Sequence, residues 1–362
     1  MKKAEAKTIK RAIAISGGGP PVGIAIGALK ALQEEDIKFD VLSGSCIGAW
    51  VSVCYALGGY EKAQLFESHN FLIDKIYQNF PVNAHIFQPD YPMLMKAFFD
   101  RLMSPDLYKY LWLPDLMQAL YEYQKEVPPE SNEDRSMYLT HWLMLNPVLR
   151  FMTDLQYNLA LPGKSKLGGW NNKAVNKWMD FEALYNLPEF IYINAYNKTK
   201  QQLEVFVNRK DHPKYQPITA DSLTAGSSIP NYAMPYPMNG DIYCEGAIVD
   251  TVNFKDLVEN HPDLDEVWVI RILDRSQAPM PTTLIEAELQ STMLLFETIA
   301  EDDIKLFKYH LKEDGRDIKV IEMYVSHKEV NYHWNQSNYT AGIKAGYEGA
   351  KQTITKYKNN EL

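Results

Sequence analysis

The stretch from Asp40 to Gly59 constrains the fold more than any other part of the chain, because it has the pattern of a strand, a tight turn and a helix. The letters VLS are typical of the end of a buried strand. The apolar run after Gly48 predicts a helix that ends at the paired glycines 58 and 59. Between strand and helix stand Gly44, Ser45, Cys46, Ile47 and Gly48.

This spacing is that of a nucleophile elbow, G-x-nucleophile-x-G. The flanking glycines Gly44 and Gly48 leave room for strand and helix to approach, and the middle residue is presented at the N-terminus of the helix, where backbone N–H groups point at it. Here the middle residue is Cys46. The alternative interpretation is a tight strand-to-helix joint with a core cysteine, and two further stretches bear on that choice.

A glycine-rich loop precedes the elbow. Residues 11–16 predict a buried strand, followed by Gly17, Gly18 and Gly19 and then by a helical pattern, VGIAIGALKALQEE. A dinucleotide fingerprint would need a small residue at Val22 and an acid at the end of the second strand, so that interpretation is rejected. A turn without function and an oxyanion hole remain. The elbow that follows favours the oxyanion hole, because bare backbone N–H groups can converge on a developing negative oxygen.

The third informative stretch contains Glu245, Gly246 and Ala247, directly after the short strand pattern IYC. A carboxylate followed by two small residues can bring its backbone close to another loop. Further strand patterns at 190–196, 202–208, 266–273 and 319–326 alternate with helical ones. This alternation predicts a largely parallel, doubly wound sheet with helices on both faces.

Residues from about 65 to 185 differ in character, being rich in Tyr, Phe, Met and Trp between polar loops. They predict a mostly helical insertion in a single α/β domain that spans 1–362. A lid over an acyl site is one interpretation. The other is that these side chains pack the insertion's own core.

Composition excludes several functional classes. A formal net charge of −9 argues against nucleic acid as a partner and against tight electrostatic docking on an anionic membrane. Three cysteines form no disulfide framework, and no stretch approaches the length of a membrane span, so a cytoplasmic protein is expected. The eight histidines lie outside the three informative stretches and show no metal-ligand spacing. We expect neither a catalytic metal nor a cofactor.

Together, the three stretches resemble the patatin-like phospholipases, lipid acyl hydrolases with a serine–aspartate dyad. SGGGPPVGIAIGALKAL is similar to that family's oxyanion loop, GSCIGA to its elbow, and AGSSIPNYAMPYPMNGDIYCEGAIVD to the stretch that carries its D-G-G/A motif. The resemblance implies a three-layer α/β sandwich, a lipid or other acyl ester or thioester as substrate, and transient contact with a membrane surface. It covers residues 11–60 and 188–255.

The chain departs from the family pattern at the chemical positions. Cys46 stands in place of the serine and Glu245 in place of the dyad aspartate, while Pro21 and Val22 replace a basic residue and a glycine. A thiol is already partly ionised at pH 7 and strongly nucleophilic. One hypothesis is therefore an acyl hydrolase or acyltransferase that works through an acyl-Cys46 intermediate, with Glu245 as base. The other is a catalytically silent lipid-binding or scaffold protein on the same fold.

Overall fold

The computed structural model describes residues 9–68, 87–88, 169–170, 178–230, 235–255, 257–277, 284–323 and 329–362, with isolated positions between them. The expected insertion at about 65–185 falls mostly outside these ranges and stays a prediction. The chain divides into two compact units, of which the larger comprises Met1–Gln88, Trp170–Ile229 and Pro235–Leu362. The central sheet, its helices and the candidate site all lie in this larger unit.

The central sheet of the described residues has nine strands, seven of which follow the order β11-β10-β1-β2-β5-β6-β7. The first five in this order run parallel to one another. β6 and β9 both pair antiparallel with β5, and β8 pairs with β9. The strands are β1 (Arg11–Ile15), β2 (Val41–Gly44), β5 (Phe190–Asn197), β6 (Gln202–Val207), β7 (Gln216–Pro217), β8 (Tyr236–Met238), β9 (Asp241–Glu245), β10 (Glu266–Ile270) and β11 (Lys319–Met323), with β3 (Phe87–Gln88) and β4 (Gly169–Trp170) outside this sheet.

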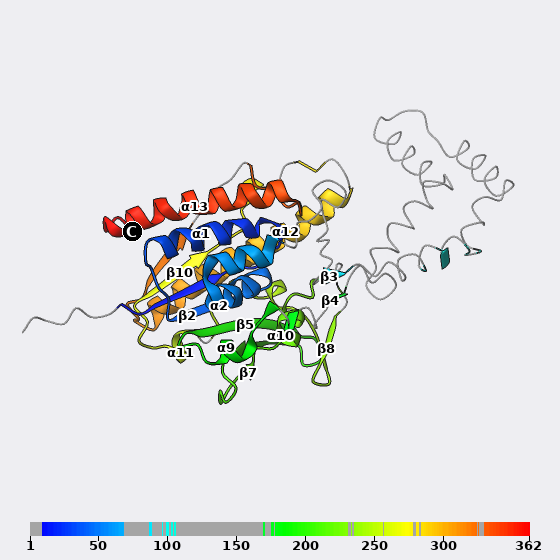
Figure 1. Cartoon of the computed structure of the whole chain (residues 1–362), viewed down its shortest axis with the longest axis horizontal. Coiled ribbons are helices and arrows are strands. Elements are labelled where there is room, and N and C mark those ends of the chain that lie inside the picture. The colour runs from blue at the N-terminus through cyan, green and yellow to red at the C-terminus, as the bar shows by residue number, and fades with distance from the viewer. Residues whose placement is uncertain are drawn as a thin grey trace, which may run out of the picture. The chain divides into compact units, whose positions relative to one another are not determined.

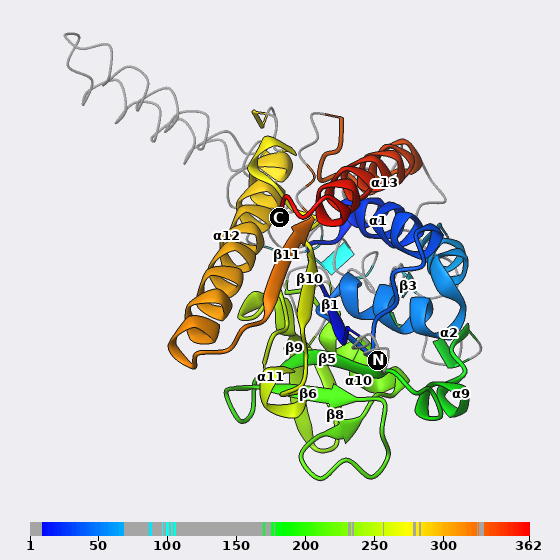
Figure 2. The same cartoon turned by 90° about the vertical axis from the view of Figure 1, so that its left-hand side faces the viewer.

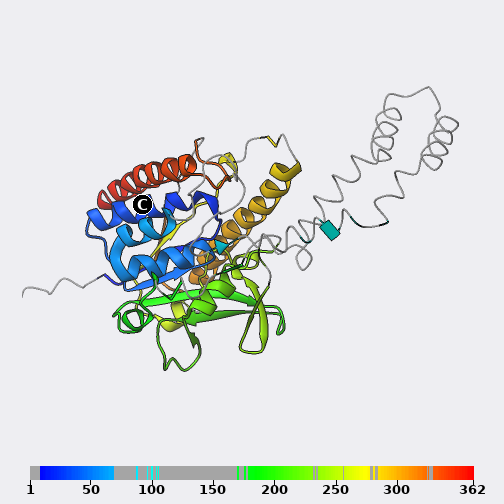
Figure 3. The ribbon, with the colours of Figure 1, turned by 45° about the vertical axis from the view of Figure 1, so that its right-hand side comes forward.

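Helices cover both faces of the sheet (Figure 2). On one face, α12 and α11 pack on the apolar side chains of β1, β2 and β10, among them Ala12, Val41 and Val267. On the other face lie α1, α2 and α13 (Figures 1 and 3). The helices are α1 (Gly23–Glu34), α2 (Ile47–Ser68), α9 (Phe181–Tyr185), α10 (Ala220–Gly226), α11 (Leu257–Asn260), α12 (Leu284–Glu313) and α13 (Gln336–Lys358), with short 3₁₀ helices η1 (Pro20–Val22), η2 (Gly246–Ile248) and η3 (Arg275–Gln277).

The contact between α1 and α13 depends on small residues. A Cβ atom on Gly27 of α1 would stand 2.0 Å from the carbonyl oxygen of Ile343 in α13. A Cβ atom on Gly346 of α13 would stand 2.0 Å from the carbonyl oxygen of Ile24. Because no side chain fits there, the two backbones touch directly, which fixes α1 and the glycine-rich loop before it against the rest of the fold.

The predicted mostly parallel sheet with helices on both faces is confirmed. The helix after the elbow is interrupted at the paired glycines, as the sequence predicts. Gly58 and Gly59 have non-helical backbone angles, with φ of −177° and 71°, and a second helical stretch continues to Ser68. One strand is shorter than expected. The strand expected over 266–273 ends at Ile270. The interruption requires glycine at position 59, because Gly59 adopts a left-handed φ that a side chain disfavours.

Candidate active site

The candidate site forms where two strands meet end to end on one edge of β5. The last residue of β2, Gly44, pairs with Ile193, and the last residue of β9, Glu245, pairs with Ala195. β6 occupies the other edge of β5 along this stretch. Because β2 runs parallel and β9 antiparallel to β5, their C-terminal ends point toward each other, about 7 Å apart at roughly 3.3 Å per residue. The sheet therefore brings the residues after β2 toward Glu245.

The turn after β2 holds Cys46 in a strained backbone conformation. Its φ angle is 52°, in the left-handed region that costs an ordinary residue about 1 kcal/mol or more. A Cβ atom on Gly44 would stand 2.4 Å from the carbonyl oxygen of Gly48, and one on Gly48 would stand 2.4 Å from that of Ile15. Both glycines are therefore sterically required, as the elbow interpretation expects.

Two backbone N–H groups are directed at the sulfur of Cys46. They belong to Gly18, in the glycine-rich loop, and to Ile47, the first residue of α2, and both lower the pKa of the thiol. Gly18 has a φ of 137° and lies against Leu273, whose Cγ atom would be 2.5 Å from a Cβ atom at this position. The donor position of Gly18 thus requires glycine for both conformation and space.

The other glycines of the loop have different roles. The N–H of Gly17 donates to the carbonyl of Thr251 at 3.0 Å, so this group is already engaged. A Cβ atom on Gly17 would lie 2.9 Å from that of Ala247 and 3.0 Å from that of Cys46. Gly19 has a φ of 63° and lies beside the ring of Trp334. At Gly17 the first loop is therefore in direct contact with both the elbow and the Gly246-Ala247 segment.

The thiol of Cys46 is mostly neutral despite its two backbone donors. Burial raises its pKa well above the ordinary value, and the negative charge and contact of Glu245 raise it further. The side chain is 9% exposed, compared with 0% for Cys54 and 2% for Cys244. All three cysteines are free thiols. A substrate that reaches the sulfur therefore meets a protonated thiol, and a base is needed to remove that proton.

Glu245 is the ionisable side chain beside this thiol. It is fully buried, and burial raises its pKa to about 7, while contact with the Cys46 thiol lowers the pKa. No hydrogen bond of regular geometry reaches either carboxylate oxygen from the described residues. A carboxyl group titrating near neutral pH can take up and return a proton at that pH, which is the property required of a general base.

A second pair of acids lies just after this motif. Asp303 of α12 accepts hydrogen bonds from the N–H groups of Thr251 and Val252, at 2.8 and 2.9 Å. Burial raises the pKa of Asp303 to about 6. Burial also raises the pKa of Asp250, and the nearby charge of Asp303 raises it further. Both residues line a pocket of about 410 Å³. The two hydrogen bonds of Asp303 tie α12 to the segment that follows Glu245.

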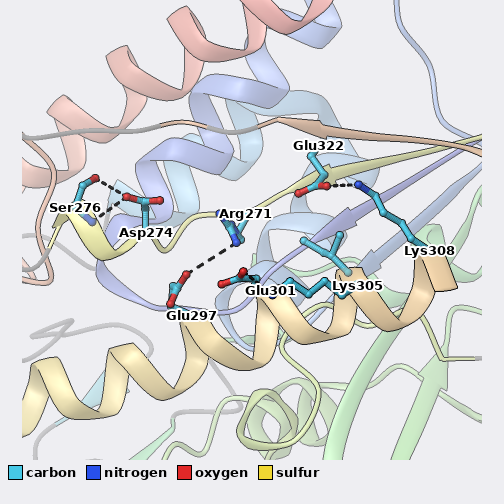
Figure 4. Close-up of a pocket in the computed structure, with 9 residues that line it drawn as sticks. Arg271, Asp274, Ser276, Glu297, Glu301, Lys305, Lys308 and Glu322 are labelled. Atoms are coloured by element: carbon cyan, nitrogen blue, oxygen red, sulfur yellow. Dashed lines mark hydrogen bonds and ion pairs between the residues drawn. The ribbon is translucent and has the colours of Figure 1, made fainter.

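A larger polar pocket, of about 580 Å³, lies between α12 and the C-terminal ends of β10 and β11 (Figure 4). Two ion pairs join α12 to the opposite wall, Arg271 with Glu297 at 4.0 Å and Lys308 with Glu322. A third joins Lys305 and Glu301 within α12, at 2.7 Å. Cys46 and Glu245 do not line this pocket. It is therefore distinct from the candidate active site.

His261 is a buried residue directly after α11. His261 contacts the hydroxyl of Tyr192 at 3.0 Å, and burial lowers its pKa to about 4. No cluster of three or more metal-binding side chains is found among the residues that the structure covers.

No helix in the described part of the chain is long and apolar enough to cross a membrane.

Two elements of the site were not singled out for these roles from the sequence. The first is the N–H of Ile47, expected only as support for the elbow. The second is Asn194, a buried residue of β5 that contacts both Ser45 and the loop after Glu245. Backbone donors follow any elbow, so the first could have been anticipated from the motif. The second depends on the strand pairing of β5 and leaves no local sequence signal.

Solved structures with similarity to this chain include VipD and ExoU. Among solved structures, VipD from Legionella pneumophila is 14% identical, with 97% of this chain and 67% of that chain covered and a TM-score of 0.41. The type III effector protein ExoU is also 14% identical, with 95% and 53% covered and a TM-score of 0.32. This chain thus spans about half the length of ExoU, which another structure assigns to Pseudomonas aeruginosa. No curated protein matches the sequence.

The sequence itself carries the family signature over most of its length. Residues 13–258 match the family described as Patatin-like phospholipase. This span includes the glycine-rich loop, the elbow and the motif of Glu245, Gly246 and Ala247. Membership implies lipid acyl hydrolase activity. The chain belongs to the patatin-like phospholipase family.

Proposed function

We propose that this protein is a lipid acyl hydrolase or acyltransferase that works through an acyl-Cys46 thioester, with Glu245 as its general base. One observation carries the proposal: a cysteine at φ 52° has two backbone N–H groups directed at its sulfur and a carboxyl of pKa about 7 beside it. Strained nucleophiles, convergent backbone donors and bases near neutral pH are properties of acyl-transfer sites. The substrate class, an apolar acyl ester or thioester, rests on family membership.

In the first half-reaction the sulfur attacks the acyl carbonyl carbon while the thiol proton passes to the Glu245 carboxylate. The oxygen of the tetrahedral intermediate becomes negative, and we assign its stabilisation to the N–H groups of Gly18 and Ile47, which are directed at the adjacent sulfur. Collapse breaks the bond to the leaving alkoxide or thiolate, which takes the proton from Glu245. The products are the free alcohol or thiol and an acyl thioester on Cys46.

In the second half-reaction water, or another acceptor, gives its proton to Glu245 and attacks the thioester carbonyl. The intermediate collapses with loss of the Cys46 sulfur, which recovers its proton from Glu245. Glutamate is about one methylene longer than the aspartate usual in this family, and sulfur is larger than oxygen. The two substitutions therefore have to be accommodated together.

A second candidate function is a catalytically silent lipid-binding protein. It is favoured by the pKa of Cys46, which burial and Glu245 raise well above the ordinary value, so that little thiolate exists at rest. This candidate predicts no turnover and no acyl adduct at Cys46. It also predicts that native Cys46 resists iodoacetamide at neutral pH.

Intact-mass spectrometry after mixing with p-nitrophenyl esters and acyl thioesters of graded chain length tests the proposal. We expect a single acyl adduct on Cys46, released by neutral hydroxylamine because it is a thioester. The variant Cys46→Ser should form an oxygen ester that resists the same treatment. Glu245→Gln should lower turnover by about 100-fold, within the range of general-base contributions.

The matched control is Cys54→Ala, which leaves Cys46 in place and should keep the adduct. Full turnover in Cys46→Ala would refute the mechanism. Absence of both adduct and turnover in the wild-type protein across the whole ester and thioester series would support the silent lipid-binding alternative.

A further inference from the structure

Asn194 occupies the position on β5 at which this strand changes partners. The residue before it, Ile193, pairs with Gly44 at the end of β2, and the residue after it, Ala195, pairs with Glu245 at the end of β9. Asn194 is fully buried. Its amide is therefore in the gap between the two strand ends that carry the nucleophile and the acid.

The two ends of this amide reach the two sides of the gap. The Oδ1 atom accepts a hydrogen bond of 2.7 Å from the hydroxyl of Ser45, the residue before Cys46. The Nδ2 atom donates to the carbonyl of Asp250 at 3.0 Å, in the loop that follows Glu245. The Ser45 hydroxyl also lies 3.0 Å from that carbonyl, which closes a triangle of three polar groups, two of them on the buried residues Ser45 and Asn194.

Steric contacts hold the amide in the same place. A Cβ atom on Gly246, the residue after Glu245, would lie 2.5 Å from Oδ1 of Asn194. The amide is thus packed between the residue before the nucleophile and the residue after the acid. Any displacement of Asn194 moves the backbone on at least one side of the Cys46–Glu245 pair.

We propose that Asn194 is a positioning residue that sets the separation of Cys46 and Glu245 by tying the elbow to the loop after the acid. The inference rests on the function proposed above, for which this separation matters. An amide suits the task because it offers one acceptor to the Ser45 hydroxyl and one donor to the Asp250 carbonyl. Aspartate, the closest isostere, lacks the donor.

The thiol itself reports the separation, without any substrate. Among the described residues, the groups acting on Cys46 are the Glu245 carboxylate and the N–H groups of Gly18 and Ile47. Loss of the Asn194 amide should let Glu245 and the elbow move apart and admit water, and both changes lower the pKa of the thiol. The rate of Cys46 alkylation by iodoacetamide as a function of pH, followed by peptide mapping of the full chain, measures this change.

Asn208 provides a matched control. It is fully buried and stands directly after β6. Its side chain accepts from the N–H of Ile191 at 2.8 Å and donates to the carbonyls of Leu184 and Glu189, both at 3.0 Å. Its amide therefore joins three backbone groups near the other end of β5, and among the described residues none of its hydrogen bonds reaches the elbow. Asn208→Ala should destabilise the fold and leave the Cys46 profile unchanged.

We expect Asn194→Ala to raise the alkylation rate of Cys46 at pH 8 about tenfold, since each pKa unit changes the thiolate fraction tenfold. Turnover should fall about 100-fold at unchanged KM, the cost of a small misplacement of reacting groups. Ser45→Ala, which removes only one of the two links, should shift the alkylation profile in the same direction by less. It replaces Asn194→Ala should that variant fail to fold.

The positioning role would be overturned if Asn194→Ala gave the same alkylation profile as Asn208→Ala. If Asn194→Ala does not fold, the same comparison is made with Ser45→Ala. This outcome is separable from failure of the proposed function. If Cys46→Ala keeps full turnover, the catalytic mechanism is wrong, yet the alkylation profile still decides whether Asn194 holds Cys46 and Glu245 together.

Discussion

Two cysteines lie at the start of helix α2 and within it, each near a buried glutamate. Only one of them has the surroundings of a nucleophile. Cys46 precedes the helix and lies beside Glu245, while Cys54 lies within the helix near Glu67. Burial and the neighbouring glutamate raise the pKa of both thiols, in that order of importance. Both glutamates are fully buried. A buried thiol next to a buried carboxyl is therefore not sufficient to define a catalytic pair.

The difference lies in the backbone. Cys46 has a φ of 52° and two N–H groups directed at its sulfur. Cys54 is in the helix interior, where backbone N–H groups are bonded within the helix, and its sulfur contacts that of Met179 at 3.8 Å. A strained turn at a helix N-terminus thus separates a candidate nucleophile from a core cysteine. The following predictions test that distinction, beginning with the largest effect.

Replacing each cysteine by alanine should separate the two sites most clearly. Cys46→Ala removes the attacking atom, so turnover of acyl esters should fall by about 1,000-fold or more. Cys54→Ala leaves a small cavity about the size of one sulfur atom and should keep turnover within about threefold while lowering stability by roughly 1 kcal/mol. Steady-state kinetics and thermal unfolding of both variants measure this. A comparable loss of turnover in both would erase the distinction.

Replacing a glycine by alanine near each cysteine should lower the free energy of unfolding by unequal amounts. In Gly48→Ala the new Cβ would stand 2.4 Å from the carbonyl of Ile15, so the elbow must distort, at about 3 kcal/mol or more. In Gly58→Ala, near Cys54, the nearest atom is the flexible side chain of Lys62 at 3.0 Å, and about 1 kcal/mol or less is expected. Denaturant unfolding compares the two free energies of unfolding, and equal losses would count against a rigid elbow.

The sequence was sufficient to predict the parts of the site that depend on local backbone geometry. Glycines at 44 and 48 around Cys46 predict the elbow, because the steric need for glycine is set by the turn itself. The small residues Gly246 and Ala247 indicated a close approach to another loop, without saying which loop. The role of Asn194 could not be predicted, since it arises from a strand that pairs with β2 and then with β9 on one edge.

The same limit explains the other differences. The fold class followed from alternating strand and helix patterns, and the paired glycines predicted the interruption of α2 at Gly58 and Gly59, yet the second helical stretch up to Ser68 was not predicted. The engagement of the Gly17 N–H by Thr251 was equally invisible, since it joins segments far apart in the sequence. Local patterns predict which backbone shapes are required, whereas the partners of buried polar groups depend on tertiary pairing.

The free energy of unfolding should report the burial of Glu245. Its pKa in the folded state is about 7, above the ordinary value of 4.5. The stabilisation from the protonated group is therefore full below pH 4.5 and is lost as the pH rises through 7, a change of about 3 kcal/mol as an upper estimate. Glu245→Gln should lack this loss and become more stable than the wild type above pH 7. Urea unfolding between pH 5 and 8 measures the difference.

Glu67→Gln is the control for this pH dependence, because it alters a buried glutamate near the other cysteine while Glu245 is retained. It should keep the loss of stability through pH 7 that is due to Glu245. Asp303, whose pKa burial raises to about 6, contributes in the same direction in every variant and cancels in the comparison. A wild-type stability that stays level from pH 5 to 8 would contradict the buried, neutral-pH carboxyl.

The smallest expected effect concerns thiol reactivity, and it distinguishes the two cysteines by the exposure of their sulfur atoms to a reagent. The Glu245→Gln variant lacks the negative charge that helps to raise the pKa of Cys46, so alkylation of Cys46 at pH 8 should accelerate. We expect only about a threefold increase, because burial, the larger cause of the raised pKa, remains. Glu67→Gln lowers the pKa of Cys54 for the same reason, yet that sulfur is 0% exposed and should stay unmodified in the native protein. Iodoacetamide labelling with peptide mapping follows both thiols in one experiment. Slower labelling of Cys46 in Glu245→Gln would mean that the carboxylate activates the thiol at rest, and the charge repulsion inferred for this pair would then be wrong.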